Sequence, residues 1–139
     1  MAIDRDSNSK RFFQVRNARN TEIAEDYTEM IADLINENGE ARSVDLAERF
    51  GVTSPTVNSI IRRLVREGLV ESKPYRSIFL TEEGKVLASF CKKRHEIVYK
   101  FLLAIGVKDE IAKIDAEGLE HHVSKETLKV FENFILKYK

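Results

Sequence analysis

The residues with the clearest chemical potential lie in one short segment, residues 117–122 (Glu-Gly-Leu-Glu-His-His). Glu117, Glu120 and His121 stand at positions i, i+3 and i+4, which place their side chains on one face of a helix. Two carboxylates and an imidazole on one face can bind a divalent metal ion if other elements complete its coordination. His122 points about 100° away from His121 on such a helix, so we expect it to lie outside the ligand set.

Further potential ligands lie upstream of this segment. Asp26 and Glu29 form another i, i+3 pair, and His95 lies on a long amphipathic stretch. Oxygen-rich, nitrogen-poor ligand sets favour Mn²⁺, with Fe²⁺ or another divalent ion next. Four carboxylates exceed the need of one divalent ion, so we expect one or two ions per chain. Acidic i, i+3 pairs are also common on solvated faces, and spacing alone leaves a plain surface role open.

Three helices must position these residues. Apolar periodicity predicts a helix over residues 21–38 that carries Asp26 and Glu29, and a long helix that begins after Thr81 and carries His95. A further helix from about Asp109 carries the acidic segment, and Ser124 is the expected cap of the last helix. The sequence therefore indicates a mostly α-helical protein.

The segment between the predicted ligand groups has the order of a winged helix-turn-helix. Ser43 is the expected cap of a short helix over residues 44–50, which Gly51 ends. Ser54 is the expected cap of the next helix, with Pro55 at its first position, and that helix ends near Gly68. Two short strands follow within residues 69–80. Helix, tight turn, helix and hairpin is an order typical of DNA-binding modules.

The predicted second helix presents a polar and basic face to solvent. From residue 53 to residue 76, five basic residues oppose two acidic ones, so this region is locally basic although the chain has zero net charge. Short polar groups can reach base edges, and arginines can bind phosphates. A solvated basic surface is the alternative. The residues that we expect to contact double-stranded DNA are Ser43, Ser54, Pro55, Thr56, Asn58, Ser59, Arg62, Arg63 and Arg76.

Composition limits the class of protein. The 139 residues suit one domain or two small ones, and the single cysteine, Cys91, excludes an intrachain disulfide and suits a reducing cytoplasm. The sequence contains no apolar stretch of membrane-spanning length and no signal-peptide core. We expect a cytoplasmic protein without a membrane partner, with a mobile polar arm over residues 1–20.

Several of these residues resemble those of a known protein family. Asp26 and Glu29 in the first helix, residues 54–57 (Ser-Pro-Thr-Val) and Arg94-His95, together with residues 115–122, are similar to the diphtheria toxin repressor family. The likeness is greatest to its manganese-dependent branch, the manganese transport regulators. It implies a winged helix-turn-helix domain over residues 21–83 and a helical dimerisation and metal-binding domain over residues 84–139.

The resemblance also implies a function. Its members bind operator DNA as homodimers with a divalent metal as corepressor. The implied ligands here are Asp26, Glu29, His95, Glu117, Glu120 and His121. Carboxylates at positions 26 and 117, where the iron-responsive branch has sulfur-containing residues, favour manganese. We therefore expect a Mn²⁺-dependent transcriptional regulator, mainly a repressor, of manganese homeostasis genes, with no enzymatic activity and no small organic substrate.

Three alternatives remain at this stage. The first is an iron(II)-responsive repressor of the same family. The second is a winged-helix regulator with a signal other than metal, whose affinity for DNA would be indifferent to chelators. The third is a helical di-metal carboxylate enzyme, which typically uses Glu-x-x-His pairs. This chain has Glu-x-x-Glu-His instead, and an enzyme would leave the DNA-binding segment without a role.

Overall fold

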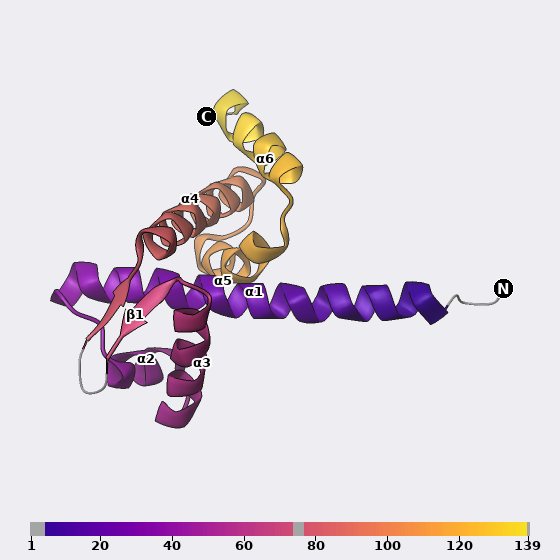
Figure 1. The fold of residues 1–139 in the computed structure, drawn as a ribbon. Coiled ribbons are helices and arrows are strands. Elements are labelled where there is room, and N and C mark those ends of the chain that lie inside the picture. The colour runs from indigo at the N-terminus through magenta and orange to yellow at the C-terminus, as the bar shows by residue number, and fades with distance from the viewer. Residues whose placement is uncertain (1–4, 74–76, 139) are drawn as a thin grey trace. The chain divides into compact units, whose positions relative to one another are not determined.

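The computed structural model describes residues 5–73 and 77–138, and its regular structure is mostly helical (Figure 1). The elements are α1 (Arg5–Asn38), α2 (Ser43–Phe50), α3 (Ser54–Arg66), β1 (Val70–Ser72), β2 (Ile78–Leu80), α4 (Glu82–Ala104), α5 (Asp109–Leu119), the 3₁₀ helix η1 (Glu120–His122) and α6 (Lys125–Lys137). They form two compact units, and each unit boundary falls inside a helix. One unit is Ile23–Phe90, and the other combines Met1–Glu22 with Cys91–Lys139. The predicted fold class is confirmed.

The Ile23–Phe90 unit folds around a core that every one of its elements supplies. Apolar residues at helical spacing on α1 and α3 meet the alternating inward residues of the hairpin. The core includes Ile31, Leu34, Leu46, Val57, Ile61, Leu64, Val70 and Ile78. β1 and β2 pair antiparallel, with Glu71 opposite Phe79. The backbone of Ala41 accepts a hydrogen bond of 2.8 Å from the Ile78 amide, which ties the hairpin to the turn after α1.

The helix-turn-helix is present, but both of its helices begin one residue earlier than expected. Arg42 occupies the cap position of α2 without a side-chain hydrogen bond, so the prediction of Ser43 as cap is wrong. At α3 the cap is Thr53, whose side chain accepts a hydrogen bond from the Thr56 amide, so the prediction of Ser54 is wrong as well. At α3 the adjacent hydroxyl residues offer the same capping chemistry, and sequence cannot choose between them. At α2 the boundary differs from the prediction by a single residue. Gly51, at φ 65°, ends α2 in the expected left-handed conformation.

The hairpin leads into α4 through Thr81, the expected cap of that helix. Its hydroxyl donates to the carbonyl oxygen of Gly68 at 2.6 Å and accepts from the Gly84 amide at 3.1 Å. The backbone of Leu69 passes close to α4 here, because a Cβ added to Gly84 would lie 2.1 Å from the Leu69 carbonyl oxygen. Glycine is therefore required at this position for a packing reason.

The first helix is longer than predicted. α1 begins at Arg5 rather than at Thr21, so the segment expected to be a mobile arm is helical from Arg5 to Asn20. No proline or glycine interrupts residues 5–20, and nothing in that stretch prevents a helix from continuing. Gly39, at φ 81°, ends α1 where the sequence predicted.

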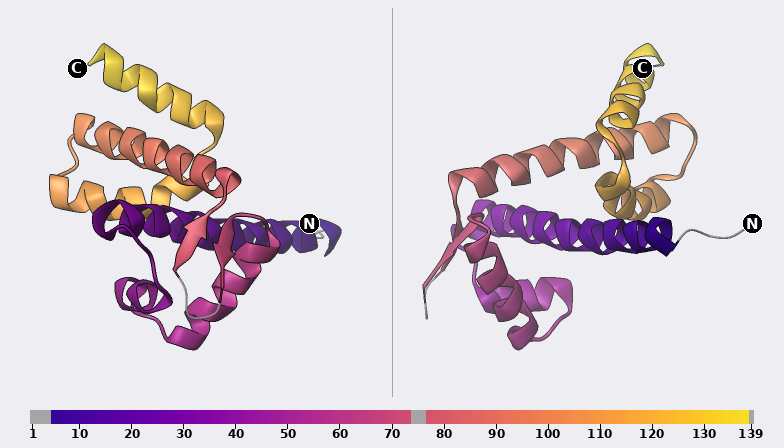
Figure 2. Two further views of the ribbon diagram at one scale, coloured as in Figure 1. Left: turned by 60° about the vertical axis from the view of Figure 1, so that its left-hand side comes forward. Right: turned by 45° about the vertical axis from the view of Figure 1, so that its right-hand side comes forward.

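In the second unit, α4 lies between α5 and α6 over its C-terminal half (Figure 2). Val98 and Leu102 of α4 pack against Ala112 and Ala116 of α5, and the small alanines allow close approach of the two helices. The ring of Phe101 stacks on that of Phe131 of α6, with centroids 3.8 Å apart. Apolar side chains on this unit that remain exposed include Leu103, Ile105, Ile111, Ile114, Leu119, Val130 and Leu136. None of the helices that the structure describes combines the length and apolar character of a membrane span.

Candidate functional site

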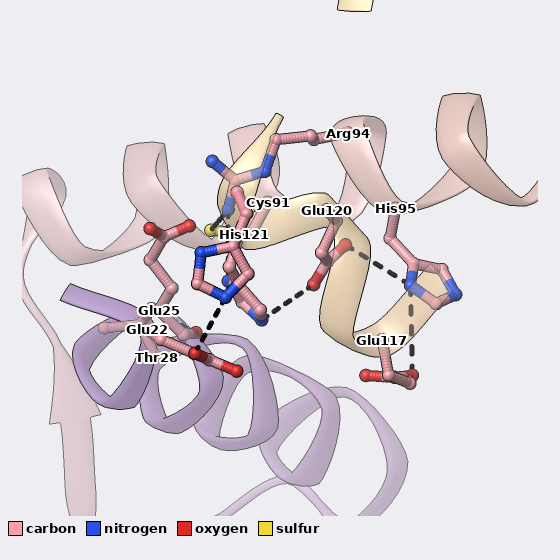
Figure 3. A network of polar contacts seen from close by, with 10 residues as sticks. Glu22, Glu25, Thr28, Cys91, Arg94, His95, Glu117, Glu120 and His121 are labelled. Carbon is pink, nitrogen blue, oxygen red and sulfur yellow. Dashed lines mark hydrogen bonds and ion pairs between the residues drawn. The ribbon is translucent and has the colours of Figure 1, made fainter. Parts of the chain in front are cut away.

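Three of the predicted ligands meet in the unit that contains α5. His95 projects from α4, Glu117 from the last turn of α5 and Glu120 from η1 (Figure 3). Nδ1 of His95 lies 3.3 Å from Oε2 of Glu120 and 3.9 Å from Oε1 of Glu117. One ligand atom from each of these three residues lies within 4.8 Å of the others. Two ligand atoms of one divalent ion lie no more than about 4.4 Å apart. The distances of 3.3 and 3.9 Å from Nδ1 of His95 fall within that limit, so His95 can share a cation with either carboxylate.

Glu120 is the central group of this cluster. Its side chain is fully buried, and neither carboxylate oxygen makes a hydrogen bond within the described part of the chain. Oε2 faces His95, whereas Oε1 lies 3.2 Å from Nε2 of His121. A buried carboxylate is costly unless it is paired with charge or coordinates a metal. The arrangement therefore fits a cation between carboxylate and imidazole groups.

We expected His121 and His122 to continue α5, but they do not. The α-helix ends at Leu119, and residues 120–122 form a 3₁₀ turn. The tighter turn changes the direction of each side chain, so the expectation of one continuous helical face for Glu117, Glu120 and His121 is wrong. The His121 side chain is almost fully buried. His122 is half-exposed, and its Nε2 lies 3.4 Å from a carboxylate oxygen of Glu22.

Arg94, one residue before His95, also reaches this cluster. It is buried, and its Nη2 lies 3.3 Å from Nδ1 of His121 and 3.8 Å from Sγ of Cys91. Burial lowers the pKa of the Arg94 guanidinium, whereas the negative charge of Glu120 opposes that change. Sequence reasoning did not predict this contact, because an arginine in a Lys-Lys-Arg-His run resembles ordinary surface charge.

The remaining two predicted ligands lie in the other unit. Asp26 and Glu29 stand one turn apart on α1, and both are partly buried. Glu22 lies one turn before Asp26 on the same helix. Its contact with His122 was also not predicted. The i, i+4 spacing to Asp26 puts Glu22 on the same face of α1, and this spacing is the signal in the sequence that could have drawn attention to Glu22.

The predicted DNA-contacting residues lie on and beside α3. Thr56, Asn58, Ser59 and Arg62 are exposed, whereas Val57, Ile61 and Leu64 on the opposite face are buried. Ser54 and Pro55 are exposed at the start of α3, and Ser43 is half-buried at the start of α2. Nε of Arg63 donates to Oε1 of Glu67 at 2.8 Å, so this arginine is already engaged within its own helix. Arg76 lies outside the described residues, as do Pro74 and Tyr75.

An open groove runs between the start of α2, the exposed face of α3 and β1. Its lining combines basic and polar side chains with the apolar side chains of two valines and an isoleucine. The lining residues are Arg42, Ser43, Val44, Asn58, Ile61, Arg62, Val65, Arg66, Ser72 and Lys73. Four cationic side chains along one groove suit a polyanion such as a nucleic-acid backbone.

Comparison with known proteins identifies the family. Residues 20–78 match the N-terminal DNA-binding domain of the iron-dependent repressors, and residues 81–139 match their metal-binding and dimerisation domain. The transcriptional regulator MntR of Escherichia coli O157:H7 is 50% identical over 136 residues, which cover 98% of this chain and 88% of that protein. The chain belongs to the iron-dependent repressor family.

Membership in the iron-dependent repressor family confirms the resemblance seen in the sequence. The family regulates transcription, so the expectation of a transcriptional regulator rather than an enzyme is confirmed as well. A more distant relative, the HTH-type transcriptional regulator MntR of Bacillus subtilis, is 38% identical over 104 residues, covering 75% of this chain and 73% of that protein. The chain thus carries a DNA-binding domain and a domain for metal binding and dimerisation.

Solved structures share the fold. The structure of the manganese regulator SloR superposes with a TM-score of 0.71 and 28% identity, over 84% of this chain and 54% of that one. A manganese-dependent transcriptional repressor in complex with manganese gives the same TM-score and identity, over 81% of this chain and 52% of that one. This chain spans about half the length of these two solved relatives.

Proposed function

We propose that this chain is a Mn²⁺-activated regulator, mainly a repressor, that binds double-stranded operator DNA as a homodimer in the cytoplasm and controls manganese homeostasis genes. The observation that carries the proposal is the buried Glu120 carboxylate, which presents one oxygen to His95 and the other to His121. A solved relative described as a manganese-dependent repressor in complex with manganese supports this choice of metal.

The chemistry of the donors supports Mn²⁺ first and Fe²⁺ second. The cluster of His95, Glu117 and Glu120 offers two carboxylates and one imidazole, and such oxygen-rich sets suit harder divalent ions. The Cys91 sulfur is not among these ligand atoms. An iron(II)-responsive repressor with the same ligands is the second candidate, since selectivity in the cell also depends on metal supply.

The proposed ligand set is Asp26, Glu29, His95, Glu117, Glu120 and His121. The first two rest on the family resemblance, and the other four also rest on geometry. Because the two oxygens of Glu120 face different histidines, Glu120 is suited to serve two ions, and we propose one or two per chain. A bound divalent cation would supply the positive charge that offsets the carboxylates. Glu120 and Glu117 would then hold η1 and the end of α5 against His95 of α4.

For DNA, the proposed contacts are Ser43, Ser54, Pro55, Thr56, Asn58, Ser59, Arg62, Arg63 and Arg76. Exposed short polar groups at the start of α3 suit base edges in a major groove, and Arg62 suits a phosphate. A second copy of the chain is the proposed occupant of the exposed apolar side chains on α5 and α6, because the family domain over residues 81–139 mediates dimerisation.

Titration with Mn²⁺, monitored by the electron paramagnetic resonance of the free ion, tests this proposal. We expect the wild-type protein to bind one or two ions per chain and Glu120→Gln to lose at least one of them. Glu126→Gln, which removes an exposed carboxylate of α6, serves as a control and should bind as the wild type does. Equal binding by Glu120→Gln and the wild-type protein would refute the proposed centre. Absence of binding by the wild-type protein would favour a winged-helix regulator with another signal.

A further inference from the structure

Arg94 makes a contact that restricts the chemistry of His121. Its Nη2 lies 3.3 Å from Nδ1 of His121 (Figure 3). A guanidinium carries N–H donors and has no acceptor. Nδ1 of His121 must therefore be the acceptor in this hydrogen bond, and it must use its lone pair.

The other ring nitrogen then carries the proton. A neutral imidazole has one N–H and one nitrogen with an available lone pair. With Nδ1 occupied by Arg94, the proton belongs on Nε2, which lies 3.2 Å from Oε1 of Glu120. The negative oxygen favours a proton on that side, so both neighbours of His121 select the same tautomer.

We propose that Arg94 is a positioning residue that occupies the only available lone pair of His121 in the metal-free protein, so that the Arg94 hydrogen bond and metal ligation by His121 exclude each other. Ligation through Nδ1 needs the lone pair that Arg94 uses. Ligation through Nε2 moves the ring proton to Nδ1, where a guanidinium donor has nothing to bond. The inference rests on the proposed role of His121 as a ligand.

The surroundings of Arg94 keep it in place. The side chain is only 9% exposed, and it projects from α4 one residue before His95. Arg94 therefore holds its place beside His121 in the metal-free protein, and metal binding at His121 must displace its hydrogen bond.

The tautomer of His121 in the metal-free wild-type protein tests this directly. Long-range proton–nitrogen correlation spectra of protein with ¹⁵N-labelled histidine distinguish protonated from unprotonated ring nitrogens. The sample is held about two pH units above the ordinary histidine pKa of about 6.5. We expect an unprotonated Nδ1 and a protonated Nε2. A protonated Nδ1 would overturn the inference without any variant being made.

The variant Arg94→Met tests the competition, because Met fills a similar volume without a donor. We expect the tautomer preference to weaken and Mn²⁺ affinity to rise by about tenfold, the equivalent of one hydrogen bond from a charged donor. Lys92→Met removes an exposed positive charge from the same helix and controls for charge alone. An affinity gain no larger in Arg94→Met than in Lys92→Met would overturn the inference. If Arg94→Met does not fold, Arg94→Lys, with its less directional donor, should give a smaller gain that still exceeds the control.

A third variant separates this inference from the proposed function. His121→Ala should lower Mn²⁺ affinity if His121 is a ligand. Wild-type affinity in His121→Ala would refute both the ligand role and the competition, even with the expected tautomer. Reduced affinity in His121→Ala together with a protonated Nδ1 in the wild-type protein would leave the metal site standing and refute only the role of Arg94.

Discussion

Nδ1 of His95, on α4, lies 3.3 Å from Oε2 of Glu120, although the Glu120 side chain is fully buried. Burial of an ionised carboxylate in a protein interior costs several kcal/mol unless charge or coordination offsets it. The two oxygens make no hydrogen bond among the described residues. The buried Arg94 guanidinium and the two facing imidazoles offset part of that cost, and a bound cation between the carboxylate and the imidazoles would offset the rest.

Replacement of Glu120 by Gln should change stability in opposite ways with and without metal. The metal-free variant should unfold at a higher temperature than the wild type, because a neutral amide avoids the burial cost of a charge. Mn²⁺ at a hundred times its Kd should stabilise the wild-type protein by about 2.7 kcal/mol. It should stabilise Glu120→Gln much less. Thermal unfolding of both proteins with Mn²⁺ or chelator measures this, and equal stabilisation of both would contradict it.

Two neighbouring arginines on α3 should differ in their effect on DNA binding. Arg62 is exposed on the groove, whereas Arg63 donates to Glu67 within α3. Arg62→Ala should weaken binding to all DNA sequences and reduce the salt dependence of log K by about 0.9, the loss of one phosphate contact. Arg63→Ala should weaken DNA binding less, because Arg63 must give up its ion pair with Glu67 before it can bind a phosphate. Anisotropy titrations over a range of salt concentrations compare the two variants. A larger loss of affinity in Arg63→Ala would contradict Arg62 as the main phosphate contact.

Two glycines in helices should respond oppositely to alanine. A Cβ at Gly84 would lie 2.1 Å from the backbone oxygen of Leu69, so Gly84→Ala should destabilise the protein by about 1–3 kcal/mol through overpacking. A Cβ at Gly118, on α5, meets no atom within 4 Å. Gly118→Ala should therefore stabilise by about 0.5–1 kcal/mol. Chemical denaturation measures the change in unfolding free energy for both variants. Changes of similar size and the same sign would contradict the close approach of the Leu69 backbone to Gly84.

The start of α5 should carry a measurable pH dependence. Hydrogen bonds from Tyr99 and then Lys113 lower the pKa of Asp109. A carboxyl group with a lowered native pKa stabilises the fold above its ordinary pKa of about 3.9, and that contribution is lost as the pH falls through the native value. Tyr99→Phe should raise the pKa of Asp109 toward its ordinary range and weaken the acid dependence of stability. Carbon NMR titration of the Asp109 carboxyl group in both proteins measures this change. An unchanged pKa in Tyr99→Phe would exclude Tyr99 as the cause.

Much of the fold could be predicted because helix stops and core periodicity are local properties. Gly39 and Gly51 end helices where expected, and the spacing of Val57, Ile61 and Leu64 correctly marked the buried face of α3. Helix starts were harder to predict. α1 continues upstream to Arg5 because nothing interrupts it, and a helix without an apolar stripe leaves no periodic signal.

The candidate site could be predicted only in part. The structure places His95 beside Glu117 and Glu120, as expected if these residues share a site. Their role as metal ligands stays a prediction from side-chain chemistry. The 3₁₀ turn at Glu120 was not predicted, because tertiary packing decides where α5 ends. Arg94 was missed for a related reason. Its burial depends on the return of η1 toward α4, which local sequence does not reveal.

The most direct test of the account is fluorescence anisotropy of a labelled duplex from the upstream region of this gene. The wild-type protein and Glu120→Gln are titrated at fixed salt, each with chelator and with Mn²⁺, in excess non-specific DNA. We predict tight binding by the wild-type protein only with Mn²⁺, and weak, metal-independent binding by Glu120→Gln. Equal binding by the wild-type protein with chelator and with Mn²⁺ would contradict a metal-activated regulator.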